Sequence, residues 1–225
     1  PSVTTRHMTE FITIDVEMAF IKGLTDIQVL ISNLINYVAV RVWKQYKAEL
    51  LALKATRPIL TKKLPEITLK ELHELYFKET DVDVRQGIDT TPEEEQFISE
   101  YSRKYWGSEA VFVTEFPASE MGFYDYKSDV TPEIIERSDL IFRGVEILTA
   151  RRREHRYPVL LERLKARGID SQQPVYKYFL QTFKYGMPNH GGFGLGLERL
   201  TQKIIGFKNV KEAALFPRDV NLLAP

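Results

Sequence analysis

Three glycines, a glutamate and an arginine stand close together near the C-terminal end of the chain. Gly192, Gly194 and Gly196 alternate with other residues, and Glu198-Arg199 follows at the start of an expected helix. The stretch lacks the Gly-Lys-Ser/Thr ending of a P-loop and the glycine spacing of a dinucleotide fingerprint, which disfavours both common nucleotide motifs. A cation in the first turn opposes the helix dipole unless an anion binds there. Arg199 is therefore either an anion-binding residue or a surface arginine.

Glu146 is a second candidate, because it lies in a segment, 139–150, whose sequence predicts one strand. By alternation it shares a face with the apolar Leu140 and Leu148, so its carboxylate needs a cation. That cation is either a neighbouring arginine or a metal ion. Thr149, three residues on, adds a hydroxyl oxygen of the kind that suits Mg²⁺.

A basic run, 151–156, follows that strand and reads Arg-Arg-Arg-Glu-His-Arg. Such a run is usually a solvated surface. Its position directly after the strand that carries Glu146 favours at least one arginine facing a carboxylate or phosphate ligand.

The N-terminal stretch 5–11 offers a further set of candidates. It contains Arg6, His7 and Glu10 and ends at Phe11, where a strand is expected to begin. Arginine and histidine can donate to phosphates, and an aromatic ring can stack on a base. Composition of this kind is equally typical of a surface loop.

The elements that must position these residues follow from the periodicity of apolar residues. Strands are expected at 11–18, 110–115 and 139–150, and the glycine-rich stretch 191–196 is expected to be a strand or a turn. Helices are expected at 25–54, from 68, at 92–105, 157–167, 174–183 and 197–205. Thr68 and Glu71 have the spacing of a capping box. His73 lies on that helix among charged residues, and we expect it to be solvated. Strands and helices are interspersed without regular βαβ alternation, which favours an α+β fold with an antiparallel sheet.

Composition excludes several other classes of protein. The 225 residues carry 31 Lys and Arg against 31 Asp and Glu, which argues against a polybasic arm or an acidic tail. The absence of cysteine excludes disulfides, a thiolate nucleophile and Cys-type zinc sites. No apolar run approaches the roughly 18 residues of a membrane helix, so we expect a cytoplasmic protein. The chain begins at Pro1, in the middle of what reads as a motif, and we expect it to be a fragment.

Four stretches together resemble the motifs of one enzyme family. They are Thr5-Arg-His-Met-Thr-Glu-Phe running into 14–20, Arg143-Gly-Val-Glu-Ile followed by Arg153-Glu-His, the segment 185–199, and Leu215-Phe-Pro-Arg-Asp through Pro225. They resemble motifs 2 and 3 and the C-terminus of class II aminoacyl-tRNA synthetases, most closely the aspartyl enzymes of archaeal and eukaryotic type. The resemblance implies a class II synthetase-like antiparallel sheet flanked by helices. It implies that 1–225 is a catalytic domain without motif 1 and without the N-terminal anticodon-binding domain.

The same resemblance implies roles for individual residues. ATP would be bound by Arg6, His7, Glu10, Phe11, Glu146, Thr149 and Arg199. His7 and Arg199 would contact the γ-phosphate, Phe11 would stack on adenine and Glu10 would hold the region of its amino group. Mg²⁺ would lie at Glu146 and Thr149, and Arg199 and Glu146 would be the catalytic pair. Arg153 would bind the side-chain carboxylate of aspartate.

The implied reaction has two steps and needs no protein nucleophile. The α-carboxylate of aspartate attacks the α-phosphorus of ATP, giving aspartyl-adenylate and pyrophosphate. The aspartyl group then passes to the terminal adenosine of tRNA. The implied partners are aspartate, ATP and tRNA, with a homodimer in the full-length protein.

The chain departs from the family pattern at three places. The motif 2 arginine that grips the α-phosphate would precede Pro1. Ala150-Arg151-Arg152 stands where a small pair and Gln are usual, and we expect Arg151 and Arg152 to face solvent or RNA. Met121 stands where Lys or Arg is usual. These departures leave open an asparagine–tRNA ligase, an adenylate-forming asparagine synthetase on the same core, and a non-catalytic paralogue that binds tRNA or protein.

Overall fold

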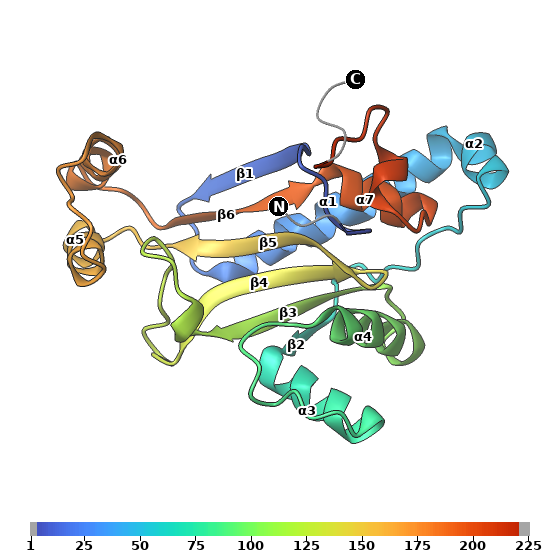
Figure 1. The fold of residues 1–225 in the computed structure, drawn as a ribbon, viewed down its shortest axis with the longest axis horizontal. Coiled ribbons are helices and arrows are strands. Elements are labelled where there is room, and N and C mark those ends of the chain that lie inside the picture. The colour runs from blue at the N-terminus through green and yellow to red at the C-terminus, as the bar shows by residue number, and fades with distance from the viewer. Residues whose placement is uncertain (1–3, 221–225) are drawn as a thin grey trace.

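A computed structural model describes residues 4–220, so the expected C-terminal likeness at 221–225 lies outside the described residues. Its centre is a six-stranded sheet in the order β1-β6-β5-β4-β3-β2 (Figure 1). The strands are β1 (Thr13–Ala19), β2 (Glu66–Thr68), β3 (Ala110–Pro117), β4 (Ile134–Phe142), β5 (Val145–Arg153) and β6 (His190–Gly196). All neighbours are antiparallel except β2 and β3, which are parallel. The expected α+β fold with an antiparallel sheet is confirmed.

Seven α-helices surround the sheet within the described residues. They are α1 (Leu24–Gln45), α2 (Lys47–Ala52), α3 (Leu69–Thr80), α4 (Pro92–Tyr105), α5 (Tyr157–Ala166), α6 (Pro174–Lys184) and α7 (Leu197–Ile205). None of these helices is long and apolar enough to cross a membrane. Short 3₁₀ turns lie at Ala118–Glu120 and Val210–Ala213.

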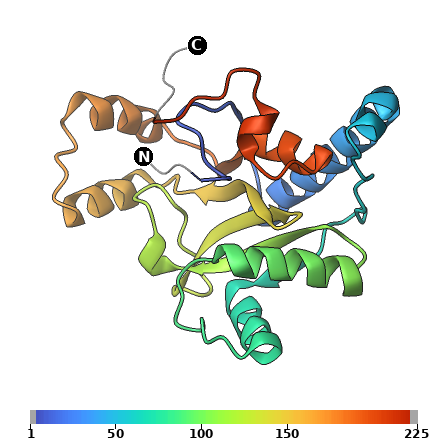
Figure 2. The same ribbon diagram turned by 45° about the vertical axis from the view of Figure 1, so that its right-hand side comes forward.

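The two faces of the sheet are covered by different helices (Figures 1 and 2). The long helix α1 packs across one face, called here the back face, where Ile27, Ile31 and Ile35 are buried against the sheet. On the opposite, front face, α3 and α4 pack over β3 and β4 through residues such as Leu72 and Ile98. The front face over β1, β6 and β5 is left for the pocket described below.

The expected helix 25–54 is two helices, because the backbone leaves the helical region at Tyr46 (φ −120°, ψ 33°). The helix also begins earlier than expected, with Gly23 at the N-cap. Asp26 accepts hydrogen bonds from the backbone N–H groups of Lys22, at 2.6 Å, and Gly23, at 3.4 Å. A carboxylate in the first turn stabilises the helix start.

The expected strand 139–150 is wrong, because a tight turn at Arg143-Gly144 divides it into β4 and β5. Both turn residues have positive φ, 48° and 77°. The φ of 77° at Gly144 favours a glycine there, because L side chains rarely adopt that conformation. The chain reverses between Leu140 in β4 and Glu146 in β5. The alternation along one strand therefore does not tell which face Glu146 shares with Leu140.

The expectation that His73 is solvated is also wrong, because His73 is buried with 3% of its surface exposed. Its Nδ1 lies 2.5 Å from Oε1 of Glu94, and its Nε2 lies 3.2 Å from the carbonyl oxygen of Gly87. The other oxygen of Glu94 accepts from the backbone N–H of Thr91 in the capping box of α4. The capping box expected at Thr68 and Glu71 is confirmed.

Candidate active site

An open pocket of about 450 Å³ lies on the front face over β1, β6 and β5. Its lining includes Arg6, His7, Phe11, Thr13, Asp15, Tyr124, Glu146, Thr149, Arg151, Arg153, Gly194, Gly196 and Arg199. The pocket therefore brings together all of the expected site residues except Glu10. Glu10 lies in an adjoining cavity that shares Phe11, and its Oε2 is 3.1 Å from Nε of Arg218.

The floor of the pocket is the glycine-rich strand β6, whose alternating glycines leave backbone where side chains would stand. In register, Gly194 lies beside Asp15 of β1 and Thr149 of β5. A Cβ at Gly194 would lie 3.1 Å from Oδ1 of Asp15 and 3.3 Å from Cγ2 of Thr13. The glycines thus keep a groove open between two walls, and they do not form a phosphate loop.

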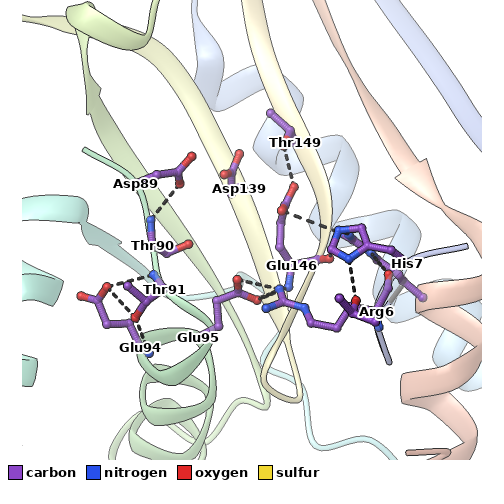
Figure 3. A network of polar contacts seen from close by, with 12 residues as sticks. Arg6, His7, Asp89, Thr90, Thr91, Glu94, Glu95, Asp139, Glu146 and Thr149 are labelled. Atoms are coloured by element: carbon purple, nitrogen blue, oxygen red, sulfur yellow. Dashed lines mark hydrogen bonds and ion pairs between the residues drawn. The ribbon is translucent and has the colours of Figure 1, made fainter. Parts of the chain in front are cut away.

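Glu146 and Thr149 share the front face because of a β-bulge. The register of β4 and β5 shifts between Leu140 and Ile141, so that Ile147 is an additional residue. In a regular strand, residues three positions apart point to opposite faces. The additional residue of the bulge brings Glu146 and Thr149 to the same face, and both line the pocket. Thr149 Oγ1 donates to Oε1 of Glu146 at 2.8 Å (Figure 3).

Arg199, in the first turn of α7, has its guanidinium fixed by the chain itself. Its Nη1 donates to the carbonyl oxygen of Glu146 at 2.7 Å, and its Nε donates to that of Arg6 at 3.3 Å. Nη1 also lies 3.6 Å from Oε2 of Glu146. The expected compensation for a cation at a helix start is therefore already supplied in part by two carbonyl groups and a carboxylate.

His7 stands against Arg199 at the same end of the pocket. Nη2 of Arg199 lies 3.2 Å from Nε2 of His7, and Nδ1 of His7 lies 2.7 Å from Oγ1 of Thr4. Because a guanidinium only donates, Nε2 accepts and the ring proton lies on Nδ1. Burial lowers the pKa of His7, and the charges of Arg199 and Arg6 lower it further. The ring is therefore neutral at pH 7.

Arg6 connects the N-terminal loop to helix α4 through Glu95 (Figure 3). Its Nη2 lies 2.6 Å and 2.5 Å from the two oxygens of Glu95, and the backbone N–H of Glu146 donates to the same carboxylate at 2.7 Å. Burial raises the pKa of Glu95, while the charge of Arg6 opposes that shift. Arg6 thus positions Glu146 from behind as well as lining the pocket.

Phe11 is held at the mouth of the pocket by α7. Phe11 is 63% exposed and lines the pocket. The buried carboxylate of Glu198 accepts the backbone N–H of Ile12 at 3.0 Å from each of its oxygens. An exposed aromatic ring on a fixed backbone can stack on a planar ligand.

The three consecutive arginines of β5 form ion pairs with three different carboxylates. Arg153 lies in the pocket, and its Nη2 is 3.0 Å from Oε1 of Glu17. Arg151 lies in the same pocket and binds Asp125. The expectation that Arg151 and Arg152 face solvent or RNA is therefore wrong.

Arg152 leaves the opposite face of the strand. Its Nη1 lies 2.9 Å from Oε1 of Glu136, and its guanidinium lies 3.7 Å from the centre of the Tyr126 ring. Its side chain is only 11% exposed. Met121, the other departure from the family pattern, is half-buried against the cluster formed by α3, α4 and β3.

A second carboxylate near Thr149, that of Asp139, is paired with an arginine. Asp139 faces Thr149 across β4 and β5, and it is bound by Arg137, whose Nη2 lies 2.5 Å from Oδ2. Arg137 also lies 3.2 Å from Oδ2 of Asp89 and stacks over the Phe116 ring. Among residues 4–220, no three acidic or histidine side chains converge as a metal site.

Several residues in or beside the pocket were not identified from the sequence. Asp15 lines the pocket and Glu17 binds Arg153, and both leave the same face of β1. Tyr124, Glu95 and Asp125 were not singled out, because their contacts with the pocket residues join positions 26 to 89 residues apart. The alternation of Asp15 and Glu17 was the only signal that could have found part of this set.

Comparison with known proteins gives the family. Residues 1–220 match the model of the tRNA synthetases class II (D, K and N). The chain is 40% identical over 223 residues to an aspartate–tRNA(Asp/Asn) ligase of Thermus thermophilus. It is 36% identical over 222 residues to an aspartate–tRNA(Asp) ligase of Pyrococcus horikoshii. Each alignment covers 99% of this chain, and the chain spans about half the length of these relatives, 51% and 50%.

Solved structures agree in fold. An aspartyl-tRNA synthetase from Entamoeba histolytica superposes with a TM-score of 0.90 at 26% identity, covering 100% of this chain and 46% of that one. An asparaginyl-tRNA synthetase from Pyrococcus horikoshii, complexed with asparaginyl-adenylate, superposes with a TM-score of 0.87 at 30% identity. That match covers 100% of this chain and 51% of the other. The chain therefore belongs to the class II tRNA synthetases of the D, K and N group.

Proposed function

We propose that this chain is the catalytic domain of an aspartate–tRNA ligase, which forms aspartyl-adenylate from aspartate and ATP and transfers aspartate to tRNA. The observation that carries the proposal is a single pocket with Arg199 and Glu146 at one end and Arg153 at the other. The relatives named as aspartate–tRNA ligases support the choice of amino acid. We propose that the full-length protein is a cytoplasmic homodimer, the cytoplasm being where ATP and tRNA meet.

The two ends of the pocket bind different substrates, one the nucleotide and the other the amino acid. We call the end lined by Arg6, His7, Glu146 and Arg199 the nucleotide end. We call the end lined by Tyr124, Arg151 and Arg153 the amino-acid end. Arg199 holds the γ-phosphate, with the neutral His7 against its guanidinium, and Phe11 stacks on the adenine ring. Arg153 binds the side-chain carboxylate of aspartate through the fork of its guanidinium.

Catalysis in this pocket consists of positioning and charge neutralisation. A carboxylate nucleophile and an anionic phosphate repel each other, so fixed cations around both lower the barrier to attack. Arg199 suits this role because its guanidinium is already oriented by the carbonyl groups of Arg6 and Glu146. A preorganised donor does not need to reorganise as the charge moves to the pyrophosphate.

The donor set fits a magnesium ion that is shared with phosphate. Mg²⁺ is commonly held by one or two carboxylates plus substrate phosphates. Glu146 offers one carboxylate with the Thr149 hydroxyl at 2.8 Å, while Asp139 is occupied by Arg137. When bound, the ion would neutralise phosphate charge. Glu146 and Thr149 would hold it, and Arg137 would keep Asp139 from adding a second full charge.

The second candidate function is asparagine–tRNA ligase, which the asparaginyl-adenylate complex of a structural neighbour favours. ATP–pyrophosphate exchange by the protein with aspartate, with asparagine and without amino acid separates the readings. We expect exchange with aspartate to exceed that with asparagine by at least tenfold. Exchange with asparagine alone would identify the second function. If the full-length protein catalyses ATP–pyrophosphate exchange with neither amino acid, the result would indicate a non-catalytic paralogue.

A further inference from the structure

A second arginine of β5, Arg151, enters the amino-acid end of the pocket beside Arg153. The two residues are separated by one position, so their side chains leave the same face of the strand, with Cα atoms roughly 7 Å apart. Arg152, between them, leaves the opposite face and is bound to Glu136. The amino-acid end therefore contains two guanidinium groups, where a side-chain carboxylate alone needs one.

Arg151 is held at one nitrogen and free at the others. Its Nη1 donates to Oδ2 of Asp125 at 2.5 Å. Asp125 is 1% exposed and also accepts the backbone N–H of Gly122 at 2.7 Å. The loop that carries Asp125 is fixed against β5, because the backbone N–H of Tyr126 donates to the carbonyl of Arg152 at 3.0 Å. Within residues 4–220, Nε and Nη2 of Arg151 have no hydrogen-bond partner.

The order of residues along β5 indicates which ligand group these free donors meet. Glu146 and Thr149 lie at the nucleotide end, Arg151 comes next, and Arg153 follows at the amino-acid end. An amino acid whose side chain binds Arg153 must direct its α-carboxylate towards the nucleotide for the two to react. That carboxylate then passes Arg151, which lies between Thr149 and Arg153 along β5.

We propose that Arg151 binds the α-carboxylate of the amino-acid substrate, so that the pocket holds both carboxylates of a dicarboxylic amino acid with one arginine each. This inference rests on the proposed amino-acid activation. Asp125 makes the arrangement possible, because it balances the charge of Arg151 in the empty pocket and fixes its orientation. A charge-assisted hydrogen bond from a fixed guanidinium is worth about tenfold to a hundredfold in affinity.

The test pairs variants with ligands that lack one charge at a time. Asparagine lacks the side-chain carboxylate, and aspartic acid α-amide lacks the α-carboxylate. We expect Arg151→Gln to weaken the binding of aspartate and asparagine at least tenfold and to change that of the α-amide less than twofold. Arg153→Gln should weaken aspartate and the α-amide and leave asparagine nearly unchanged. Dissociation constants from isothermal titration calorimetry, without ATP, report this directly.

Two further variants separate binding from folding. Arg151→Gln leaves Asp125 buried with a single hydrogen bond, so the double variant Arg151→Gln with Asp125→Asn removes that charge as well. It should reproduce the ligand pattern of the single variant. Arg152→Gln, on the back face, should weaken none of the three ligands. Thermal unfolding of each variant checks that it folds.

The outcomes distinguish this inference from the proposed function. Suppose that the unmodified protein binds aspartate. If Arg151→Gln then leaves the affinity for aspartate unchanged, or weakens the affinity for the α-amide as strongly as that for aspartate, the role of Arg151 is wrong and the proposed function stands. If the unmodified protein binds none of the three ligands, the proposed function fails first.

Discussion

Arg199 at the nucleotide end of the pocket and Arg153 at the amino-acid end are held in different ways. At the nucleotide end, Arg199 donates to the backbone carbonyls of Glu146 and Arg6. At the amino-acid end, Arg153 forms an ion pair with Glu17, whose side chain is 52% exposed, and its guanidinium lies over the Tyr124 ring. A carbonyl of the main chain cannot be exchanged for a ligand, whereas an exposed carboxylate can be replaced by the carboxylate of a substrate.

Under the proposed function, this difference separates a fixed catalytic part from an adjustable selective part. Substitutions at the nucleotide end should reduce both stability and the rate of adenylate formation, because the same hydrogen bonds serve both. Substitutions of Arg153 and Glu17 should change which amino acid is preferred and leave stability nearly constant, since exposed ion pairs contribute little. The predictions below test that division.

The largest effect is expected for Arg199→Ala. Loss of one preorganised charge-stabilising donor should lower adenylate formation by about 10²–10³, measured by ATP–pyrophosphate exchange in the full-length protein. The loss of donors to two carbonyl groups should also lower the free energy of unfolding by about 1–3 kcal/mol, measured by urea denaturation. Arg41→Ala is the matched control, because Arg41 is exposed on α1 and lies outside the pocket.

Unchanged exchange activity in Arg199→Ala would reject its role with the nucleotide. Reduced activity with unchanged stability would show that the carbonyl contacts do not contribute to folding, and the contrast between the two ends would then disappear.

The second effect is on amino-acid selectivity. Arg153→Leu should remove most of the preference for aspartate over asparagine, a change of about 10- to 100-fold in the ratio of their kcat/KM values. The physical reason is that a neutral amide cannot use the charge of the guanidinium. Arg152→Leu is the control on the back face, and it should leave the ratio unchanged even if stability falls. Equal effects of the two substitutions would contradict the assignment of Arg153.

The local parts of this structure could be predicted from the sequence, and the long-range parts could not. The capping box at Thr68 and the glycine-rich strand depend on neighbours a few residues away. The turn at Arg143-Gly144 was missed because apolar residues continue on both sides of it, so the periodicity reads as one strand. The bulge at Ile147 depends on the register with β4, which no single strand specifies.

The candidate site shows the same limit. The resemblance placed Glu146, Arg153 and Arg199 in one pocket, as the structure does. It could not place Arg151, because its direction is set by Asp125, 26 residues earlier in the chain. A basic run reads as a solvated surface until its buried carboxylate partners are known.

The third effect concerns stability alone, at a site outside the pocket. Burial acts to lower the pKa of His73, but the hydrogen bond and charge of Glu94 outweigh it and raise the pKa above the usual value near 6.5. The folded state therefore holds the proton more tightly than the unfolded state. The stabilisation is complete below about pH 6.5 and is lost as the pH rises through the raised value.

His73→Ala should lower the free energy of unfolding by about 1.5–3 kcal/mol at pH 6, because it removes a hydrogen bond to a buried charged group. His73→Gln keeps a donor but cannot titrate. Urea denaturation between pH 6 and 8 should show the unmodified protein losing stability relative to His73→Gln. A constant difference across that range would mean that His73 does not titrate in the folded state.

The smallest effect is expected for Glu17→Gln, and it tests the exchangeable contact directly. Nε and Nη2 of Arg153 both donate to Oε1 of Glu17, at 3.3 Å and 3.0 Å. Under the proposed function, the side-chain carboxylate of aspartate competes with Glu17 for these two donors. An exposed ion pair is worth about 0.2–1 kcal/mol, so its removal should tighten aspartate binding by about 1.5- to 5-fold and change stability very little. Asparagine, which does not compete for the charge of Arg153, is the matched ligand and should bind with unchanged affinity. Weaker binding of aspartate to the variant would mean that Glu17 holds Arg153 in the position that the substrate needs. The amino-acid end would then be as preorganised as the nucleotide end.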